Sequence, residues 1–433
     1  MRLPALLVAG LTVAPLVIAV PAPAVTAPGP AKANDFNGDG EHDFAVASRF
    51  SPRNSDDKAR GRVSVIYGGR HRVQTLTPQS LRLPGFTVDM SLGEALTSAD
   101  FDRDGFADLA ITAFGYRKVI IVYGSRKGLS SRRALLPVDS RGGNTTLVTG
   151  DFDGDRRPDL SVTLSSRHWL FTEIGRGSNV RSTPPSLLGY HPRPVAADFT
   201  GDGITDLVHA FAWHEKGTTA KLILFKGSKN GLGRPVETDL VKVRSVAAGD
   251  VNGDGRTDLV AGTALSSEKK DGRVRVAYGT EEGLSKPVLL SGLPKQGRDF
   301  GASVSVRDVN GDRYADVAVG DPREETSKNR GGAVVVLRGS RKGITAKGAQ
   351  IFTQETKGVP GGGEPHDAFG QIVRLTDLTG DGRADLVIAS SGEAPDGRLL
   401  LLKNHKGKIT TKGLKIFSGK RLGFVDSSWE ALP

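Results

Sequence analysis

The chain has 433 residues, of which 37% are hydrophobic and 25% are charged, as is ordinary for a globular protein. It contains no Cys, which excludes disulfide bonds and thiol catalysis. The formal net charge of +11 favours an anionic partner, such as a cell-wall polymer or another anionic glycan, or it only keeps the protein soluble; without aromatic residues interleaved in a basic cluster, we expect no nucleic acid to bind.

Residues 1–33 have the features of a signal peptide. Arg2 is the only early charge, and an apolar stretch from Leu3 to Val20 is followed by small residues. We predict cleavage after Ala33, which leaves a formal charge of +9 because Arg2 and Lys32 are removed. The alternative is an uncleaved membrane anchor. No later stretch is long and apolar enough to span a membrane, so we expect a secreted protein.

A ten-residue loop sequence rich in Asp occurs seven times in the rest of the chain. Its copies begin at Asp35, Asp100, Asp151, Asp198, Asp250, Asp308 and Asp377. Self-similarity at such intervals marks a repeat architecture, in which each repeat is one supersecondary unit. Residues 34–433 are therefore interpreted as one repeat domain.

Each repeat contains short apolar segments typical of β-strands. One strand leads into the loop, and a second leaves it, as in Asp258–Gly262. A third follows, β-branched and too short for a helix; its copies are 62–67, 118–123, 169–174, 221–225, 273–278, 333–337 and 398–402. A turn with paired Gly then precedes a fourth strand. Four antiparallel strands in each of seven repeats predict an all-β fold, a seven-bladed β-propeller.

Polar insertions lengthen some repeats, at residues 49–60, 266–271, 321–330 and 354–367. Such loops either carry a binding function or are only solvated decoration.

The repeated loop has the composition of a calcium site. Calcium takes six to eight oxygen ligands, and side chains at positions 1, 3 and 5, a carbonyl at position 7 and a carboxylate at position 9 can supply them. Gly at position 6 permits the sharp turn. The predicted ligands of these DxDxDGxxD loops are Asp35, Asn37, Asp39, Glu41 and Asp43; Asp100, Asp102, Asp104, Phe106 and Asp108; Asp151, Asp153, Asp155 and Asp159; Asp198, Thr200, Asp202, Ile204 and Asp206; Asp250, Asn252, Asp254, Arg256 and Asp258; Asp308, Asn310, Asp312 and Asp316; and Asp377, Thr379, Asp381, Arg383 and Asp385.

The seven copies are unequal, so up to seven Ca²⁺ ions are expected. The Asp100 loop has four carboxylates and should bind best, while Thr200 and Thr379 are weaker ligands. In the Asp151 and Asp308 loops, Arg156 and Arg313 replace the Gly at position 6, so these loops are expected to bind weakly or stay empty. The alternative reading of all seven is a plain Asp-rich turn.

This pattern resembles the FG-GAP/VCBS repeat of the integrin α-chain β-propeller. The FG element occurs as Phe300-Gly301 and Phe369-Gly370, with Leu92-Gly93 as a variant, and the nearest match to the GAP element is Gly320-Asp321-Pro322. The resemblance implies a seven-bladed, calcium-stiffened propeller. It transfers no ligand-binding residues of integrins.

The leading interpretation is a secreted, calcium-binding, non-enzymatic propeller that recognises a protein or a glycan, acting as a monomer. Trp169, Trp213 and Trp429 either stack on a sugar or pack between blades. The alternative is an extracellular enzyme that degrades polysaccharides, a lyase or hydrolase. Its spare acids and bases show no spacing that links them; they are Glu94, Glu173, Glu364, His191, His214 and His366. A purely structural envelope protein is a third reading.

The two ends of the chain are predicted to build one blade together. Cleavage after Ala33 leaves no residues for a strand before the first loop. In three other repeats a Gly lies seven residues before the first Asp of the loop, and Gly423 in the tail lies seven residues before Glu430. We therefore predict that residues 421–432 supply the missing inner strand and close the ring.

Overall fold

The computed structural model describes residues 34–48, 61–68, 72–87, 89–138, 145–164, 167–174, 179–183, 190–212, 221–241, 243–263, 273–293, 297, 299–324, 331–393, 397–422 and 430–431. The predicted signal peptide and the insertions 49–60 and 266–271 lie outside these residues. All regular structure in the described part is β-strand, and no helix there is long and apolar enough to cross a membrane.

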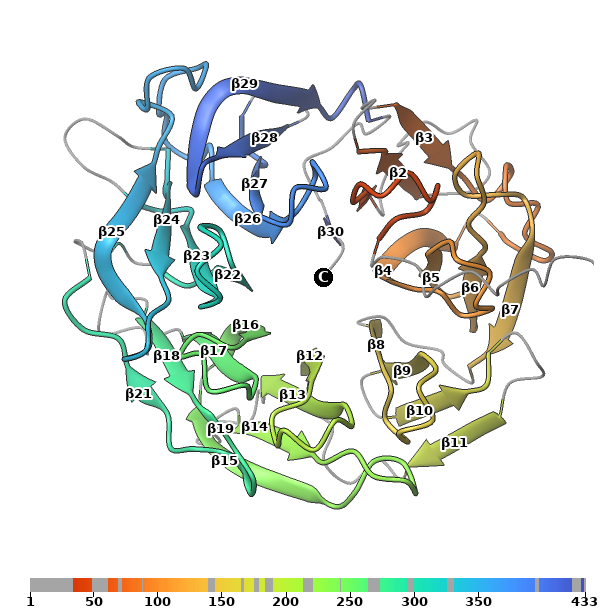
Figure 1. Ribbon diagram of the computed structural model, residues 1–433. Helices are drawn as coiled ribbons and strands as arrows, with labels where there is room; N and C mark the ends of the chain where they lie inside the picture. Colours follow the sequence, from red (N-terminus) through yellow and green to blue (C-terminus); the bar gives the residue numbers. More distant parts are fainter. Residues whose placement is uncertain are drawn as a thin grey trace, which may run out of the picture.

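The described strands form seven four-stranded antiparallel sheets and one two-stranded hairpin. Figure 1 shows the sheets arranged radially around a central axis, which confirms the predicted seven-bladed β-propeller. In blades 2 to 7 the first strand lies nearest the axis and the fourth lies at the rim. Because neighbouring strands are antiparallel, the connections between strands one and two and between strands three and four lie at the same end of the ring.

The strand bounds are as follows. Blade 1 contains β1 (Phe44–Ser48), β2 (Arg62–Ile66), β3 (Val73–Leu76) and β30 (Glu430–Ala431). Blade 2 contains β4 (Ser91–Ala99), β5 (Asp108–Phe114), β6 (Lys118–Val122) and β7 (Arg133–Pro137), and blade 3 contains β8 (Thr145–Gly150), β9 (Asp159–Leu164), β10 (Arg167–Thr172) and β11 (Asn179–Thr183). Blade 4 contains β12 (Tyr190–Ala197), β13 (Asp206–Ala212), β14 (Lys221–Phe225) and β15 (Pro235–Val241). Blade 5 contains β16 (Val243–Gly249), β17 (Asp258–Thr263), β18 (Arg273–Ala277) and β21 (Val288–Leu289), beside the hairpin β19 (Gly279–Thr280) and β20 (Gly283–Leu284). Blade 6 contains β22 (Ser303–Arg307), β23 (Asp316–Asp321), β24 (Ala333–Arg338) and β25 (Thr345–Phe352), and blade 7 contains β26 (Phe369–Thr376), β27 (Asp385–Ser390), β28 (Arg398–His405) and β29 (Lys408–Ser418).

The second strand of most blades is apolar on both faces because each sheet packs against two neighbours, whereas β9 and β13 also bury Ser161, Thr163 and His209. On β5, Leu109 and Ile111 pack into the cluster shared with blade 1, whereas Ala110 packs into the cluster shared with blade 3. Alternate residues of a strand point to opposite faces, so a sheet buried on both sides favours apolar residues on both faces. This explains the continuous apolar runs in the sequence.

The FG element joins neighbouring blades by close backbone contact. Phe300 and Phe369 are buried, and Gly301 and Gly370 adopt positive φ. A Cβ on Gly320, at the end of β23, would lie 2.0 Å from the carbonyl oxygen of Gly370. The Gly of the degraded GAP element therefore makes room for the FG backbone of the next blade.

Strand β30 lies innermost in blade 1, where it pairs with β1 through Val46 with Ala431 and Ala47 with Glu430. Leu422 is fully buried beside this blade, and its carbonyl oxygen accepts a hydrogen bond from Ser64 Oγ at 2.6 Å. Strand β30, from the C-terminal end of the chain, thus occupies the innermost position of blade 1. The extent of the closing segment within 421–432 stays a prediction, since residues 423–429 and 432–433 lie outside the described part.

The insertion 354–367 is folded onto blades 6 and 7. Gln354 and Asp367 are buried, and Gln354 Nε2 donates a hydrogen bond to Asp367 Oδ2 at 2.9 Å. Val359 joins the core cluster between these blades. Trp169 is also buried, in the cluster between blades 2 and 3, which supports packing for this residue; Trp213 and Trp429 lie outside the described residues.

Candidate metal centre

Six of the Asp-rich loops connect the first and second strands of their blades, and the Asp35 loop leads into β1 in the same place, so all seven gather at one end of the ring. In every loop the N–H of position 6 donates to Oδ2 of the Asp at position 1, for example Gly40 to Asp35 at 2.9 Å. The N–H of position 7 donates to Oδ1 of the Asp at position 5, for example Phe106 to Asp104 at 3.0 Å. These local hydrogen bonds give all seven loops one shape.

That shape requires positive φ at two positions. Position 6 has positive φ in every loop, including Arg156 at 64° and Arg313 at 75°, where the sequence lacks Gly. Position 4 also has positive φ in every loop; it is Gly in six of them and Arg103, at 60°, in the Asp100 loop. The recurring Gly at position 4 is a signal in the sequence for this second positive φ. The Asp100 loop, which the sequence predicted to bind best, therefore also carries a strained non-Gly residue.

The Asp at position 9 is buried at the start of the second strand. Its Oδ2 accepts the N–H of position 2 in all seven loops, as from Phe101 to Asp108 at 2.9 Å. Its Oδ1 accepts an N–H from the turn between strands three and four, as from Gly124 to Asp108 at 2.9 Å. Equivalent donors to Oδ1 are Gly68, Gly227, Gly279, Gly339 and Asn404. This carboxylate therefore joins the loop to the turn of its own blade.

Carboxylate oxygens converge at two of the loops. One oxygen from each of Asp100, Asp102 and Asp108 lies within 4.8 Å of the others, and Asp151, Asp153 and Asp159 form the same arrangement. Positions 1, 3 and 9 thus come together, whereas the predicted ligand at position 5 is absent from both groups. The other five loops have Asn or Thr at position 3.

Burial and crowding shift the acidity of the position 9 carboxyls. Desolvation, together with the charges of Asp102 and Asp100, raises the pKa of Asp108 to about 8. Desolvation, together with the Asp charges of their own loops, likewise raises the pKa of Asp43 and of Asp159 to about 7. A nearby cation would relieve this repulsion.

Three of the crowded oxygens are buried without a hydrogen-bond partner. They are Asp102 Oδ1 in the Asp100 loop and Asp151 Oδ1 and Asp159 Oδ1 in the Asp151 loop. Buried polar atoms are usually paired, and hard carboxylate oxygens are the ligands that calcium prefers. The donor sets of both loops therefore fit a calcium ion, including the Asp151 loop that sequence reasoning ranked as doubtful.

In the Asp308 loop an Arg pairs with the predicted ligand at position 9, whereas in the Asp100 loop Arg132 pairs with the position 3 carboxylate, Asp102 Oδ2, at 2.7 Å. Arg338 Nη1 lies 2.8 Å from Asp316 Oδ2, a carboxylate with no exposed surface, and the guanidinium lowers the pKa that burial raises. The corresponding residues before the turn Gly in blades 1, 2 and 5 are Tyr67, Tyr123 and Tyr278. An internal cation therefore already compensates this carboxylate. In the sequence, the place of Arg338 is visible only when the third strands are aligned with one another, and not when the loops are aligned.

The acids and bases suggested for an enzyme are dispersed where they are described. Glu94 is buried on β4 and accepts a hydrogen bond from Thr145 Oγ1 at 3.0 Å, while Glu173 follows β10. Glu364 and His366 lie in the segment before β26, the side chain of His191 is outside the described residues, and so is His214.

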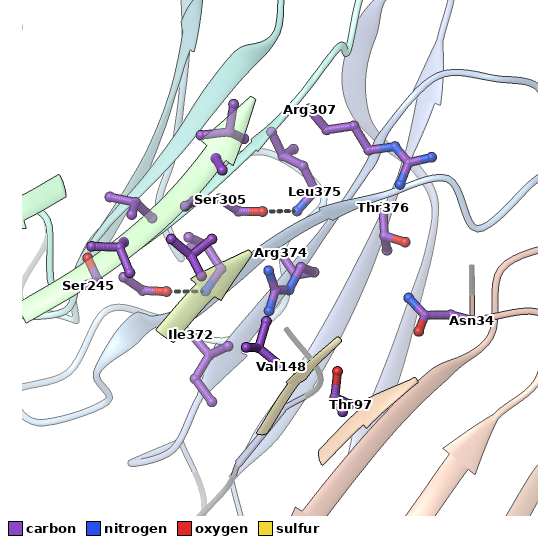
Figure 2. A pocket seen from close by; sticks show the side chains of 18 of the residues that line it. Asn34, Thr97, Val148, Ser245, Ser305, Arg307, Ile372, Arg374, Leu375 and Thr376 are labelled. Atoms are coloured by element: carbon purple, nitrogen blue, oxygen red, sulfur yellow. Dashed lines mark hydrogen bonds between the residues drawn. The ribbon is translucent and has the colours of Figure 1, made fainter. Parts of the chain in front are cut away.

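A cavity of about 530 Å³ lies on the axis of the ring, lined by residues of all seven blades. Figure 2 shows Arg307 and Arg374 reaching along its wall from β22 and β26. Ser305 Oγ accepts the N–H of Leu375 at 2.9 Å, so hydroxyls of one blade satisfy the open strand edge of the next. The lining combines small apolar residues such as Ala247 and Ala302 with Ser and Thr side chains.

Comparison with known proteins shows which repeat family these repeats resemble. The FG-GAP repeat model matches residues 243–276, 300–337 and 369–402, and the FG-GAP-like repeat model matches residues 100–162 and 151–209. Integrin alpha pat-2 of Caenorhabditis elegans is 31% identical over 234 residues, which cover 48% of this chain and 18% of the integrin. Phosphatidylinositol-glycan-specific phospholipase D of Rattus norvegicus is 34% identical over 166 residues, which cover 35% of this chain and 18% of the phospholipase. The matched part is less than a fifth of each relative.

Among solved structures, an Agrocybe aegerita lectin that recognises non-reducing terminal N-acetylglucosamine is similar over 90% of this chain and 95% of its own. The TM-score is 0.59 and the sequence identity is 14%, so this likeness concerns the fold alone.

Proposed function

Because the chain is an FG-GAP repeat protein that resembles the integrin α-chain β-propeller, we propose that it is a secreted, calcium-binding and non-enzymatic module that recognises a protein or a glycan. Recognition of a glycan is suggested by the lectin with the same fold, and recognition of a protein by the integrin likeness. Both are roles in binding rather than in turnover.

The observation that supports calcium most directly is the pair of carboxylate triads with buried, unpartnered oxygens. Asp100, Asp102 and Asp108 would hold one ion and Asp151, Asp153 and Asp159 another. The remaining loops share the same backbone shape and offer Asn or Thr oxygens at position 3. The ion would supply positive charge that neutralises each loop and stiffens that end of the ring.

Thermal melting in calcium and in chelator tests this part of the proposal. Extracellular calcium modules have Kd values of about 10⁻⁴–10⁻³ M. At ten times such a Kd, each occupied site adds about 1.4 kcal/mol to the free energy of unfolding. We expect the melting temperature to rise clearly with calcium, and an unchanged midpoint would refute calcium binding.

Binding is tested on an array of glycans and extracellular proteins, with and without calcium. Retention of specific glycans or proteins supports the module, and incubation with polysaccharides should release no new reducing ends. Release of such ends would replace the proposal with the polysaccharide-degrading alternative. N-terminal sequencing of the exported protein tests secretion, with Asn34 expected as the first residue.

A further inference from the structure

A second set of charged residues lies in the turns between strands three and four. In blades 2, 4 and 6 these turns share one structure, in which Ser125, Ser228 and Ser340 donate their hydroxyls to the carbonyls of Gly128, Gly231 and Gly343 at 2.7 Å. The two central residues of each turn are exposed, and most are cationic: Arg126 and Lys127, Lys229 and Asn230, and Arg341 and Lys342.

Backbone hydrogen bonds place these turns beside the Asp-rich loops. The N–H of Ser125 donates to the carbonyl of Phe36 in the preceding blade's loop at 3.1 Å, and Ser340 donates to Val251 at 3.1 Å in the same way. The turn Gly is also bonded to the position 9 carboxylate of its own blade. The basic turns and the loops therefore share one face of the ring.

Exposed cations occur on neighbouring blades over part of this face. Four adjacent blades, in ring order 6, 7, 1 and 2, contribute exposed cations that we call the basic arc: Arg341, Lys342, Lys406, Arg72, Arg126 and Lys127. Arg72 links two of these blades, because its Nη2 donates to the carbonyl of Lys127 at 2.7 Å. In blade 5 the equivalent turn is acidic, with Glu281 paired to Arg256 at 2.9 Å, so the arc ends before it.

The charge of this face depends on what the loops hold. The seven ten-residue loops sum to −18, while the whole chain has a formal charge of +11, so the remainder of the chain carries +29. Without a cation, the loop carboxylates lie beside the basic arc and offset it. Calcium in the loops removes that negative charge and leaves the arc uncompensated. The potential of the face then favours an anion.

We propose that the loop face binds an acidic polysaccharide through the basic arc when calcium occupies the loops. This inference rests on the proposed calcium binding and identifies the surface and the ligand class. Carboxylate or sulfate groups repeated along a glycan match cations repeated around the ring. The exposed central residues of the described turns include no aromatic side chain on which a nucleic-acid base would stack, which favours a glycan.

The test uses chondroitin sulfate, which carries carboxylate and sulfate groups, with hyaluronate as the carboxylate-only arm and a single-stranded DNA oligonucleotide as the phosphate arm. Binding of the full-length protein is measured by calorimetry in calcium and in chelator. The variant reverses four charges of the arc: Arg126→Glu, Lys127→Glu, Arg341→Glu and Lys342→Glu. The matched control reverses four exposed charges in segments at the other end of the ring: Arg82→Glu, Lys357→Glu, Lys420→Glu and Arg421→Glu.

We expect the arc variant to bind at least about tenfold more weakly than the control, since four favourable charges become repulsive. Equal weakening in both variants, or none, would refute the arc as the binding surface. Preferential binding of DNA would refute the glycan as its ligand. Metal analysis of each protein separates calcium binding by the loops from glycan binding by the basic arc. If the protein holds calcium and the arc variant still binds the glycan, only the proposal for the basic arc is refuted.

Discussion

The ring of Phe106 lies against Gly38 of the preceding loop, so closely that a Cβ on Gly38 would lie 2.6 Å from Phe106 Cε1. The same relationship joins position 7 of one loop to position 4 of the loop before it in further pairs: Ile204 with Gly154, Arg256 with Gly201, Tyr314 with Gly253 and Arg383 with Gly311. Backbone bonds accompany it, such as Ala107 N–H to the carbonyl of Asp35 at 2.9 Å. The loops thus support one another around the ring.

Substituting Gly38 should therefore cost more stability than substituting Gly203. Both residues have positive φ, so Ala at either position introduces strain of about 1–2 kcal/mol. Only Gly38→Ala also clashes with Phe106, because no atom lies within 4 Å of a Cβ on Gly203. Urea denaturation should show the larger loss for Gly38→Ala, and Phe106→Ala should recover part of it in the double variant. Equal losses in both single variants would contradict the contact.

The two carboxylate triads should each hold one calcium ion. Asp102→Ala and Asp153→Ala remove a converging oxygen, so each variant should lose about one ion per chain by metal analysis. Asn310→Ala, in the loop whose position 9 is paired with Arg338, is the matched control and should lose none. If Asp102→Ala loses one calcium ion per chain and Asp153→Ala loses none, the Asp151 loop does not bind calcium. The sequence prediction that Arg156 weakens this loop would then be correct.

Replacing Arg338 should create a calcium site in the Asp308 loop. Arg338→Tyr introduces the residue found at this place in three other blades and frees Asp316 Oδ2 for a metal. We expect about one additional bound calcium per chain. Arg341→Gln, which removes the same charge at an exposed turn position, controls for net charge. No gain over that control would show that position 3 or Arg313, rather than Arg338, limits the site.

Two buried histidines should make the protein less stable in acid. His168 and His209 lie 5.8 Å apart between blades 3 and 4, and desolvation lowers their pKa values to about 4 and about 3, from 6.5. The histidines of the unfolded chain therefore take up protons at a higher pH than those of the folded chain. Their contribution to the free energy of unfolding is fully present above pH 6.5 and is lost as the pH decreases toward 3. At pH 5 each histidine should cost about 2 kcal/mol relative to pH 7.5.

The comparison of variants isolates this effect from the loop carboxyls. His209→Gln should show a smaller loss of melting temperature between pH 7.5 and pH 5 than the unsubstituted protein. His405→Gln, at an exposed position, should show the unsubstituted behaviour. Identical pH profiles for all three proteins would rule out the histidine pair as a source of acid sensitivity.

Removing the residues after Ser418 should sharply lower stability. The truncation removes Leu422 and the strand β30 and leaves the inner edge of β1 without a partner. We expect a large drop in melting temperature or an insoluble protein. A truncated chain that melts like the full-length one would show that the ring closes without this strand.

The seven loops were predictable from the sequence because their geometry is local. The hydrogen bonds that shape each loop join residues no more than seven positions apart, so the order of Asp and Gly determines both the positive φ angles and the oxygen donors. The apolar strands between the loops likewise predicted the sheets, since both faces of every blade are buried.

Only the tertiary structure revealed the contacts between elements that distinguish individual loops. The pairing of Arg338 with Asp316 spans 22 residues, and the packing of Phe106 on Gly38 joins two blades, so neither appears in the pattern of a single loop. The register of β30 on β1 joins opposite ends of the chain. Such contacts depend on how the blades stack around the axis, which local sequence does not specify.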